Sequence, residues 1–482
     1  MPRMDTLPLY RQLANHYRHA IAAGTLAAGE RLPSVRVMMQ RHGVSLTTAL
    51  QACRQLEADG VVEARPRSGY FVRSRRSGAL APASEPVSGL PDPAQYIGIH
   101  PRVSHIIAAG QQAQVNVNLS GAAGAPALYP TAALHSASIN ALRKLHDVEG
   151  VYGQPAPPSG HPALRDILAK RALAAGITIS QDDIIITHGC IEALNLALRA
   201  VSQPGDVVAV ESPTFFGLLQ ILESLGLRAV EIPASPSTGL SLEALQLAAQ
   251  TYAGIRAVVV VPNLQNPLGC IMPDSQKAAL VAWCEQQDIA LIEDDTYSVL
   301  ADSEVQPTAL KSWDRSGNVI HCASLHKTLA PGLRLGWISA GRWQARVAML
   351  KYAQSRGNEL LPQLAVSDFM ASGAYERHLR RLRTALQHQR GQMADAIASY
   401  FPAGTRLNVP AGGVALWVEL PEGASSERLF HQALHEGIRI SPGLMYSNSR
   451  RFDRHIRLCF GAPYSREMDH ALRRLATLAL SV

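Results

Sequence analysis

Residues 324–338 read SLHKTLAPGLRLGWI and contain the most informative lysine of the chain. Lys327 follows an apolar run of strand length, with Ser324 three residues before it and Arg334 seven residues after it. The chain has 6 Lys and 39 Arg, so it rarely uses lysine to supply positive charge. Only an amine can condense with an aldehyde, because guanidinium stays protonated and is a poor nucleophile. We therefore predict that Lys327 forms a Schiff base beside an anion bound by Ser324 and Arg334; the alternative is a solvated surface lysine.

Four shorter motifs upstream lie next to other apolar runs. They are THGCIE (187–192), PTFF (213–216), NPLG (266–269) and EDDTY (293–297). Ligands of α/β proteins bind beyond the carboxyl ends of the strands, and amides at a helix N-terminus bind phosphate. Each motif also has an ordinary interpretation, such as a turn asparagine, a capping aspartate or a core phenylalanine. Together with Lys327, the motifs indicate one ligand site.

The apolar runs also indicate an α/β fold for residues 99–482. They have the length and composition of strands and alternate with helical segments, which is typical of a mostly parallel sheet covered by helices. The predicted strands are Ile184–Thr187, Val207–Val210, Ala257–Val261, Ala290–Glu293, Val319–Cys322 and Leu335–Ser339. From about residue 370 a long Arg-rich helix leads into a smaller α+β subdomain, with strands at Val414–Glu419 and Ile456–Phe460.

The first 78 residues carry all of the excess positive charge. They contain 12 Arg and 5 acidic residues, a net charge of +7, which equals the net charge of the whole chain. The remaining residues are therefore neutral overall. This asymmetry predicts a polyanion-binding module attached to a neutral body; the alternative is an Arg-rich solvated surface.

The same segment contains the elements of a winged helix-turn-helix. Helices are predicted for Pro8–Ala23 and Ser34–Arg41, and Ser45 can cap a third helix. Two short strands, Val61–Ala64 and Tyr70–Val72, form the hairpin of the wing. The predicted apolar faces are Leu9, Leu13, Tyr17 and Ile21 in the first helix and Ala49, Ala52, Cys53 and Leu56 in the third.

Composition and cysteine content limit the possible number of domains and the expected location of the protein. The chain has 482 residues, of which 47% are hydrophobic and 17% charged, which suggests two or three domains and excludes global disorder. The sequence lacks an apolar run of membrane-span length, and its six cysteines form no CxxC pair, so we expect a cytoplasmic protein with reduced thiols. We predict no metal site, because His431 and His435 lack a third ligand. Residues 79–98, rich in Ala, Ser and Pro, are predicted to be a flexible linker.

The order of these motifs resembles fold-type I pyridoxal-phosphate enzymes, the aspartate aminotransferase superfamily. With its N-terminal module, the whole chain resembles the MocR-type subgroup of GntR-family transcriptional regulators. The DNA-binding side of the resemblance rests on PLYRQLANHYRHAI, GERLPSVR, HGVSLTTA and RQLEADGVVEARPRSGYFV. The cofactor side rests on VYGQPAPPSGHPALR, NPLG, EDDTY and SLHKTLAPGLRLGW.

The resemblance implies how pyridoxal 5′-phosphate is bound. Lys327 would form the internal aldimine, and Asp294 would keep the pyridine nitrogen protonated, which makes the ring an electron sink. Tyr297 and Asn266 would donate hydrogen bonds to the phenolic oxygen, and Phe215 would stack on the ring. The phosphate would be bound by Gly189, Cys190, Ile191, Ser324 and Arg334.

Two further positions follow from the resemblance. Arg457 would clamp the carboxylate of a substrate or effector in a bidentate manner. Tyr152 would reach the phosphate of a neighbouring subunit, which implies a homodimer.

On the DNA side, the resemblance points to the second helix, to the start of the third helix and to the wing. The implied DNA contacts are Arg36, Ser45, Thr47, Thr48, Arg65 and Arg67. Many relatives carry arginine where Leu46 stands, and arginine can contact the edge of guanine. Leu46 cannot make that contact, so base recognition would shift to the threonines or to the wing.

The implied function is that of a transcriptional regulator that binds double-stranded operator DNA. It would hold the cofactor on Lys327 and sense the cofactor itself or an amino compound that displaces Lys327 by transimination. One alternative is an active aminotransferase with an accessory DNA-binding module, because the residues needed for half-transamination are present. Another is a sensor of cofactor level that has no amine effector.

Overall fold

The computed structural model describes residues 8–27, 29–59, 61–65, 68–72, 80–84, 95–96, 101–146, 156–252 and 254–482. The chain divides into an N-terminal unit that contains residues 1–79 and a larger unit that contains residues 80–390 and 400–482. Among the described residues, no helix is long and apolar enough to cross a membrane.

The N-terminal unit is a winged helix-turn-helix, as predicted. It consists of α1 (Leu9–Ala22), α2 (Val35–His42), α3 (Leu46–Ala58) and the antiparallel strands β1 (Val62–Arg65) and β2 (Gly69–Val72). The third helix begins at the predicted cap, where the Ser45 hydroxyl accepts a hydrogen bond from the Thr48 amide at 3.2 Å.

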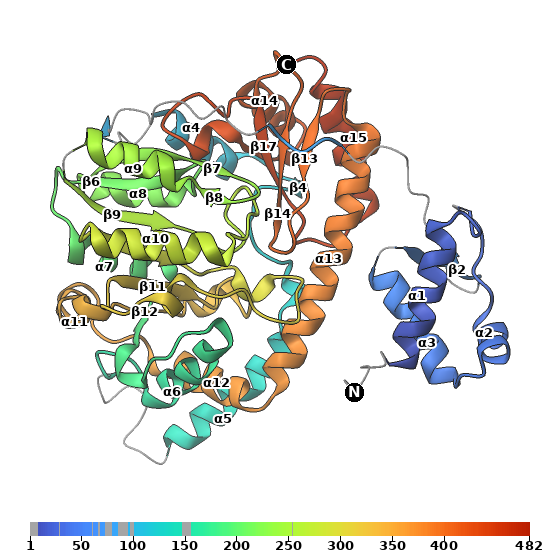
Figure 1. The fold of residues 1–482 in the computed structure, drawn as a ribbon, viewed down its shortest axis with the longest axis horizontal. Coiled ribbons are helices and arrows are strands. Elements are labelled where there is room, and N and C mark those ends of the chain that lie inside the picture. Colours follow the sequence, from blue (N-terminus) through green and yellow to red (C-terminus); the bar gives the residue numbers. More distant parts are fainter. Residues whose placement is uncertain are drawn as a thin grey trace, which may run out of the picture. The chain divides into compact units, whose positions relative to one another are not determined.

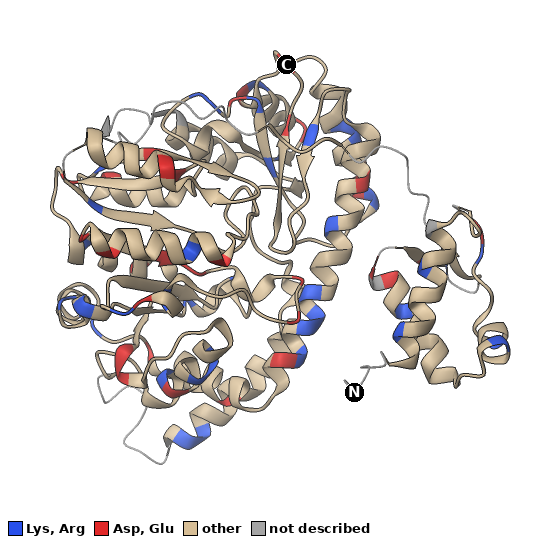
Figure 2. Cartoon of the chain, in the orientation of Figure 1, with Lys and Arg blue, Asp and Glu red and all other residues tan. Residues whose placement is uncertain are grey.

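The core of this unit confirms the predicted apolar faces with one exception. Leu13 and Tyr17 of α1 are buried in one core together with all four predicted residues of α3. Leu9, however, is 63% exposed, because it starts the first turn of α1, before the helix reaches the core. Figure 2 shows basic residues along the helices of this unit.

The larger unit is built on a mostly parallel sheet, which confirms the predicted fold class (Figure 1). The strand order is β3-β7-β6-β9-β10-β11-β12-β5. The neighbours from β7 to β11 pair in parallel, whereas the pairs β3–β7, β11–β12 and β12–β5 are antiparallel. The strands are β3 (Gln95–Tyr96), β5 (Ile185–Thr187), β6 (Val207–Ser212), β7 (Arg228–Ser235), β9 (Ile255–Val260), β10 (Ala290–Asp294), β11 (Val319–Ser324) and β12 (Gly336–Ser339), with β8 (Gly239–Leu240) paired to β7. All six predicted strands of this sheet are present within two residues of the predicted bounds.

Helices cover both faces of the sheet. Along β6, Val208 and Val210 pack on the face covered by α7 and α8, whereas Val207 and Ala209 pack on the opposite face with α9 and α10. The helices of the larger unit up to residue 400 are α4 (Pro101–Gln112), α5 (Thr131–His146), α6 (Pro162–Ala172), α7 (Cys190–Val201), α8 (Phe216–Ser224), α9 (Leu242–Thr251), α10 (Asp274–Gln286), α11 (Gln344–Gln354), α12 (Leu360–Ala371) and α13 (Ala374–Tyr400).

The C-terminal part contains a second, antiparallel sheet of order β13-β14-β17-β16. Its elements are β13 (Arg406–Asn408), β14 (Ala415–Glu419), α14 (Ser426–His435), β16 (Ser441–Pro442), β17 (His455–Cys459) and α15 (Arg466–Leu478). A separate pair, β4 (Val117–Asn118) and β15 (Ile438–Arg439), runs parallel and joins the segment after α4 to this part.

Residues 80–84 attach to this second sheet. The Leu407 amide donates to the carbonyl oxygen of Ala81 at 2.9 Å, and the Ala83 amide donates to Asn408 Oδ1 at 3.0 Å. Ser84 binds Glu419 twice, through its amide and its hydroxyl, each at 2.6 Å. The described start of the predicted linker is therefore held along β13 and β14.

Candidate functional site

The register of the large sheet brings the predicted motifs to one edge. Asp294 and Ser324 end β10 and β11, Ser324 pairs with Gly336, and Gly336 pairs with Thr187 at the end of β5. The turn after Thr187 therefore lies beside the lysine-bearing turn. Glycine is needed at position 336, because a Cβ atom there would lie 2.7 Å from the Cα of Gly189.

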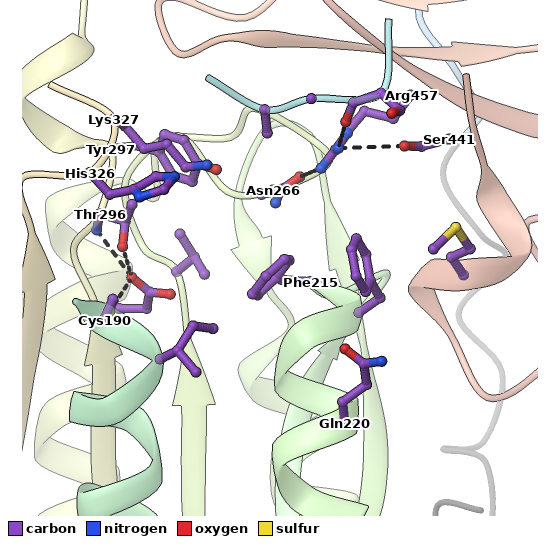
Figure 3. Close-up of a pocket in the computed structure, with 18 of the residues that line it drawn as sticks. Cys190, Phe215, Gln220, Asn266, Thr296, Tyr297, His326, Lys327, Ser441 and Arg457 are labelled. Atoms are coloured by element: carbon purple, nitrogen blue, oxygen red, sulfur yellow. Dashed lines mark hydrogen bonds between the residues drawn. The ribbon is translucent and has the colours of Figure 1, made fainter. Parts of the chain in front are cut away.

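A cavity of about 590 Å³ lies at this edge (Figure 3). Its lining includes every described residue that we predicted for the cofactor or for a bound carboxylate. These are Gly189, Cys190, Ile191, Phe215, Asn266, Asp294, Tyr297, Ser324, Lys327, Arg334 and Arg457. Tyr152 lies outside the described residues. Figure 3 shows Lys327 and Tyr297 on one side of the cavity, Arg457 and Ser441 on the other, and Phe215 between them.

Asp294 presents a buried carboxylate to the cavity. Its Oδ1 accepts hydrogen bonds from the amide of Thr296 at 3.1 Å, from the hydroxyl of the same residue at 2.5 Å and from Cys190 Sγ at 3.2 Å. Burial raises the pKa of Asp294, and the hydrogen bonds of Thr296 and Cys190 oppose that rise. Because the described donors all bind Oδ1, Oδ2 remains an acceptor for a protonated ring nitrogen.

The start of α7 and Arg334 form a corner suited to an anion. Helix α7 begins at Cys190, so the amides of Cys190 and Ile191 have no acceptor within the helix. The Arg334 Nη2 donates to the carbonyl oxygen of His188 at 3.1 Å, which holds the guanidinium beside Gly189. A Cβ atom at Gly189 would lie 3.4 Å from that nitrogen, so the glycine keeps the corner open. Helix amides, the Ser324 hydroxyl and a guanidinium together suit a phosphate.

Lys327 carries an amine that loses its proton easily. Burial lowers the pKa of Lys327 to about 8, and the positive charges of Arg457 and Arg334 contribute to this lowering. Burial also lowers the pKa of the neighbouring His326 to about 4, so its imidazole is neutral near pH 7. A substantial fraction of the lysine is therefore a neutral nucleophile at physiological pH.

Arg457 places a buried cation on the opposite wall. It projects from β17, is 2% exposed, and donates to Asn266 Oδ1 at 3.0 Å and to the carbonyl oxygen of Ser120 at 2.6 Å. Among the described residues, no carboxylate pairs with it, and its Nε has no hydrogen-bond partner. A buried guanidinium without a counter-ion is a receptor for a carboxylate. The bond to Arg457 also leaves the amide nitrogen of Asn266 free to donate to a ligand.

Sequence reasoning missed several residues of this cavity. Thr296 lies inside the EDDTY motif, and its two hydrogen bonds to Asp294 follow from that spacing, so it could have been found. The side chain of Cys190 was missed because only its amide was considered. Ser120 and Ser441 reach the cavity through β4 and β16, and no local pattern predicts those positions.

In the N-terminal unit, the predicted DNA contacts lie on the surface. Arg36 is exposed in the first turn of α2, Ser45 and Thr47 are exposed at the start of α3, and Thr48 is half-buried beside the cap. Leu46 is 53% exposed at the same place, so an apolar side chain occupies the tip of the candidate recognition helix.

The wing presents Arg65 at the end of β1. Its side chain is exposed, and its guanidinium lies 4.3 Å from the ring centre of Phe71. Arg67 lies outside the described residues.

The two units define a class of protein. A lysine of lowered pKa, a buried aspartate with one free oxygen and an anion corner at a helix N-terminus are the groups that fold-type I proteins use to hold pyridoxal phosphate. The residues present fit this cofactor, because each of its polar groups has a described partner of matching chemistry. The class is a pyridoxal-phosphate-dependent fold joined to a winged helix-turn-helix.

Comparison with known proteins identifies the family. Residues 116–475 match the family "Aminotransferase class I and II", and residues 9–72 match "Bacterial regulatory proteins, gntR family". The HTH-type transcriptional regulator YjiR of Escherichia coli is 36% identical over 472 residues, which cover 97% of each chain. The chain belongs to the GntR-family regulators that carry a class I and II aminotransferase domain, the MocR type.

Solved structures support the fold and the cofactor. Kynurenine aminotransferase of Pyrococcus horikoshii, solved with pyridoxamine phosphate, has a TM-score of 0.72 at 26% identity and covers 79% of this chain and 94% of its own. LysN, the α-aminoadipate aminotransferase of Thermus thermophilus solved with N-(5′-phosphopyridoxyl)-L-leucine, has a TM-score of 0.70 at 26% identity, with the same coverage. The larger unit therefore has the fold of pyridoxal-phosphate enzymes.

Proposed function

We propose that this protein is a transcriptional regulator that binds operator DNA through residues 1–78 and senses pyridoxal phosphate, or an amino compound that reacts with it, in the Lys327 pocket. One observation carries the proposal. A single chain joins a DNA-binding unit, with Ser45 and Thr47 exposed at the start of its recognition helix, to a cavity in which a reactive lysine lies across from Arg457, an arginine without an ion pair among the described residues. The regulator YjiR shares this organisation over nearly its whole length.

Each of the main pocket residues binds a different part of the cofactor or of the incoming amino acid. Pyridoxal phosphate, when bound, supplies an aldehyde that can be exchanged between amines. Lys327 offers the amine of the protein, and its lowered pKa lets it release and regain a proton near neutral pH. Asp294 holds a ring N–H, and Arg334 with the start of α7 neutralises a phosphate. Arg457 orients the carboxylate of an incoming amino acid.

A contact route connects the pocket to the start of the linker. Arg457 lies on β17, which pairs with β14 so that Trp417 stands opposite Arg457 and Glu419 opposite His455. The same Glu419 accepts two hydrogen bonds from Ser84. A ligand that favours one position of β17 would therefore bias the segment that leads to the DNA-binding unit.

The proposal extends to assembly and location. We infer that two copies associate, since a homodimer would present two DNA-binding units to paired half-sites. The expected site of action is the cytoplasm, where DNA, cofactor and amino compounds meet. The domain division into residues 1–78, a linker at 79–98 and a body at 99–482 is part of the same proposal.

A second candidate function is transamination, because the pocket holds every described residue predicted for the cofactor and the carboxylate. Footprinting of the DNA upstream of its own gene, with and without pyridoxal phosphate and candidate amines, separates the possibilities. Selective protection that an amine alters, without formation of a 2-oxo acid, is the result expected for the regulator. Multiple turnovers without preference for any DNA would support the enzyme, and a response to the cofactor alone would support a cofactor-level sensor.

A further inference from the structure

The pocket contains a third arginine, for which the functions above have no role. Arg439 ends β15 and lines the cavity together with Ser441 and Arg457. Within the part of the chain that the structure describes, no carboxylate forms an ion pair with Arg439. Its guanidinium is therefore available for a ligand.

The guanidinium of Arg439 is held in a defined place. It lies against the backbone of Gly110 in α4, where a Cβ atom would be 2.7 Å from its Nε and 2.9 Å from its Cζ. Any side chain at position 110 would displace it. The glycine thus lets the arginine head lie flat on the helix at the wall of the cavity.

The strands bring the two arginines to the same cavity. Ser441 pairs with Arg457 in the register of β16 and β17, and Arg457 Nη2 lies 3.5 Å from Ser441 Oγ. Arg439 precedes Ser441 by two residues, and in an extended segment such residues lie about 7 Å apart on the same side. The two guanidinium groups therefore border the same cavity.

The described cavity lining has more positive than negative side chains, which favours binding of a further anion. Among the described residues, its lining contains four basic side chains, Lys327, Arg334, Arg439 and Arg457, and one carboxylate, that of Asp294. The phosphate of the cofactor would neutralise Arg334, and an α-carboxylate would neutralise Arg457. Arg439 remains uncompensated. Apolar residues of α4, α14 and the segment after β16 also line the cavity: Ile106, Ile107, Phe430 and Met445.

We propose that the ligand of this pocket is an α-amino acid whose side chain ends in a carboxylate, with its α-carboxylate on Arg457 and its side-chain carboxylate on Arg439. This inference rests on the proposed function and names the ligand class of the same site. A guanidinium binds a carboxylate through two charge-assisted hydrogen bonds, whereas an amide or methyl group of the same size offers no charge to bind.

The test is a titration of the cofactor-loaded protein with amino acids, followed through the absorbance of the cofactor. L-Glutamate and L-2-aminoadipate should perturb the spectrum at concentrations about tenfold or more below those needed for L-glutamine and L-norleucine. Arg439→Gln should remove this preference. Gly110→Ala should weaken it, because the added methyl group displaces the guanidinium without removing its charge. Arg428→Gln, which removes an exposed arginine of the same subdomain outside the cavity, should leave the preference unchanged.

The outcomes separate this inference from the function on which it rests. Equal responses to acidic and neutral amino acids, or an undiminished preference in Arg439→Gln, would overturn the inference and leave the sensor function standing. If no amino acid perturbs the cofactor, the amine-sensing function fails, and the inference fails with it. Glutarate, which lacks an amine, should compete with L-glutamate in the wild type but not in Arg439→Gln.

Discussion

Lys327 gives the pocket a chemical property that can be measured directly. An ordinary lysine has a pKa of about 10.4, whereas burial and the charge of Arg457 lower the pKa of Lys327 to about 8. Only the neutral amine attacks an aldehyde, so the rate of cofactor attachment should rise with pH and level off above about 8. At pH 7 it should be about a tenth of its maximum. Stopped-flow absorbance between pH 6.5 and 10 measures this profile.

Arg457 provides an internal check on this interpretation. Replacing Arg457 with Gln removes a positive charge that lowers the lysine pKa, so the profile should move to higher pH. Arg428→Gln removes a distant exposed charge and should leave the profile in place. A wild-type profile that still rises at pH 10 would mean that Lys327 is an ordinary lysine.

Asp294 should determine how tightly the ring of the cofactor is held. Asp294→Asn keeps an oxygen for the Thr296 and Cys190 donors but replaces the free acceptor Oδ2 with a donor. Loss of one charged hydrogen bond costs about 2 kcal/mol, which corresponds to roughly 30-fold weaker cofactor binding. Titration by absorbance tests this value, and Thr296→Ser, which retains a hydroxyl, should bind the cofactor almost normally. Unchanged affinity in Asp294→Asn would exclude the assigned contact.

Among the elements, β13 and β14 should transmit the ligand signal to the linker. The double change Ser84→Ala and Asn408→Ala removes two hydrogen bonds that hold residues 83 and 84 on these strands. Each bond is worth about 1 kcal/mol, so the segment should detach more often without loss of the fold. Cofactor binding should be unaffected, whereas the effect of an amine on operator affinity should fall several-fold in a DNA-binding titration. A full amine response in the double variant would show that the signal takes another route.

The strands that sequence analysis located are those whose side chains are almost all apolar. Six buried runs of the central sheet were predicted because burial on both faces selects continuous apolar residues. The eight-residue strand β7 was missed because Glu231 and Pro233 interrupt its apolar run. Glu231 is buried with hydrogen bonds from Ser212 and Ser447 at 2.7 and 2.6 Å and from the Asn448 amide at 2.6 Å, and these partners are distant in sequence.

The residues of the candidate site also fall into two groups, those that local sequence patterns predict and those that they do not predict. Lys327, Asp294 and Asn266 follow strands of the central sheet, so local patterns and the α/β edge rule predicted that they would lie together. Arg439 and Ser120 enter the cavity because β15 pairs with β4 from the other end of the chain. The pairing of β15 with β4 depends on how the C-terminal part packs, and no periodicity within either segment predicts it.

At the scale of the whole molecule, DNA binding and cofactor binding should be separable. Arg36→Ala removes an exposed cation of α2 and should weaken operator binding about tenfold while the cofactor absorbance stays normal. Lys327→Ala should abolish that absorbance and the amine response but leave basal DNA binding. Gel shifts at several salt concentrations, together with absorbance spectra, measure both properties. If Arg36→Ala lost cofactor and DNA together, the division at residue 78 would be wrong.

The central claim is that pyridoxal phosphate is held by one lysine, which an amino compound displaces. Borohydride reduction of the cofactor-loaded full-length protein, followed by peptide mass mapping, tests it most directly. We expect a phosphopyridoxyl group on Lys327 and none on the other five lysines. Excess amino acid ligand should prevent this modification. An unmodified Lys327, or a modification that the ligand cannot prevent, would show that Lys327 does not hold the cofactor in this way.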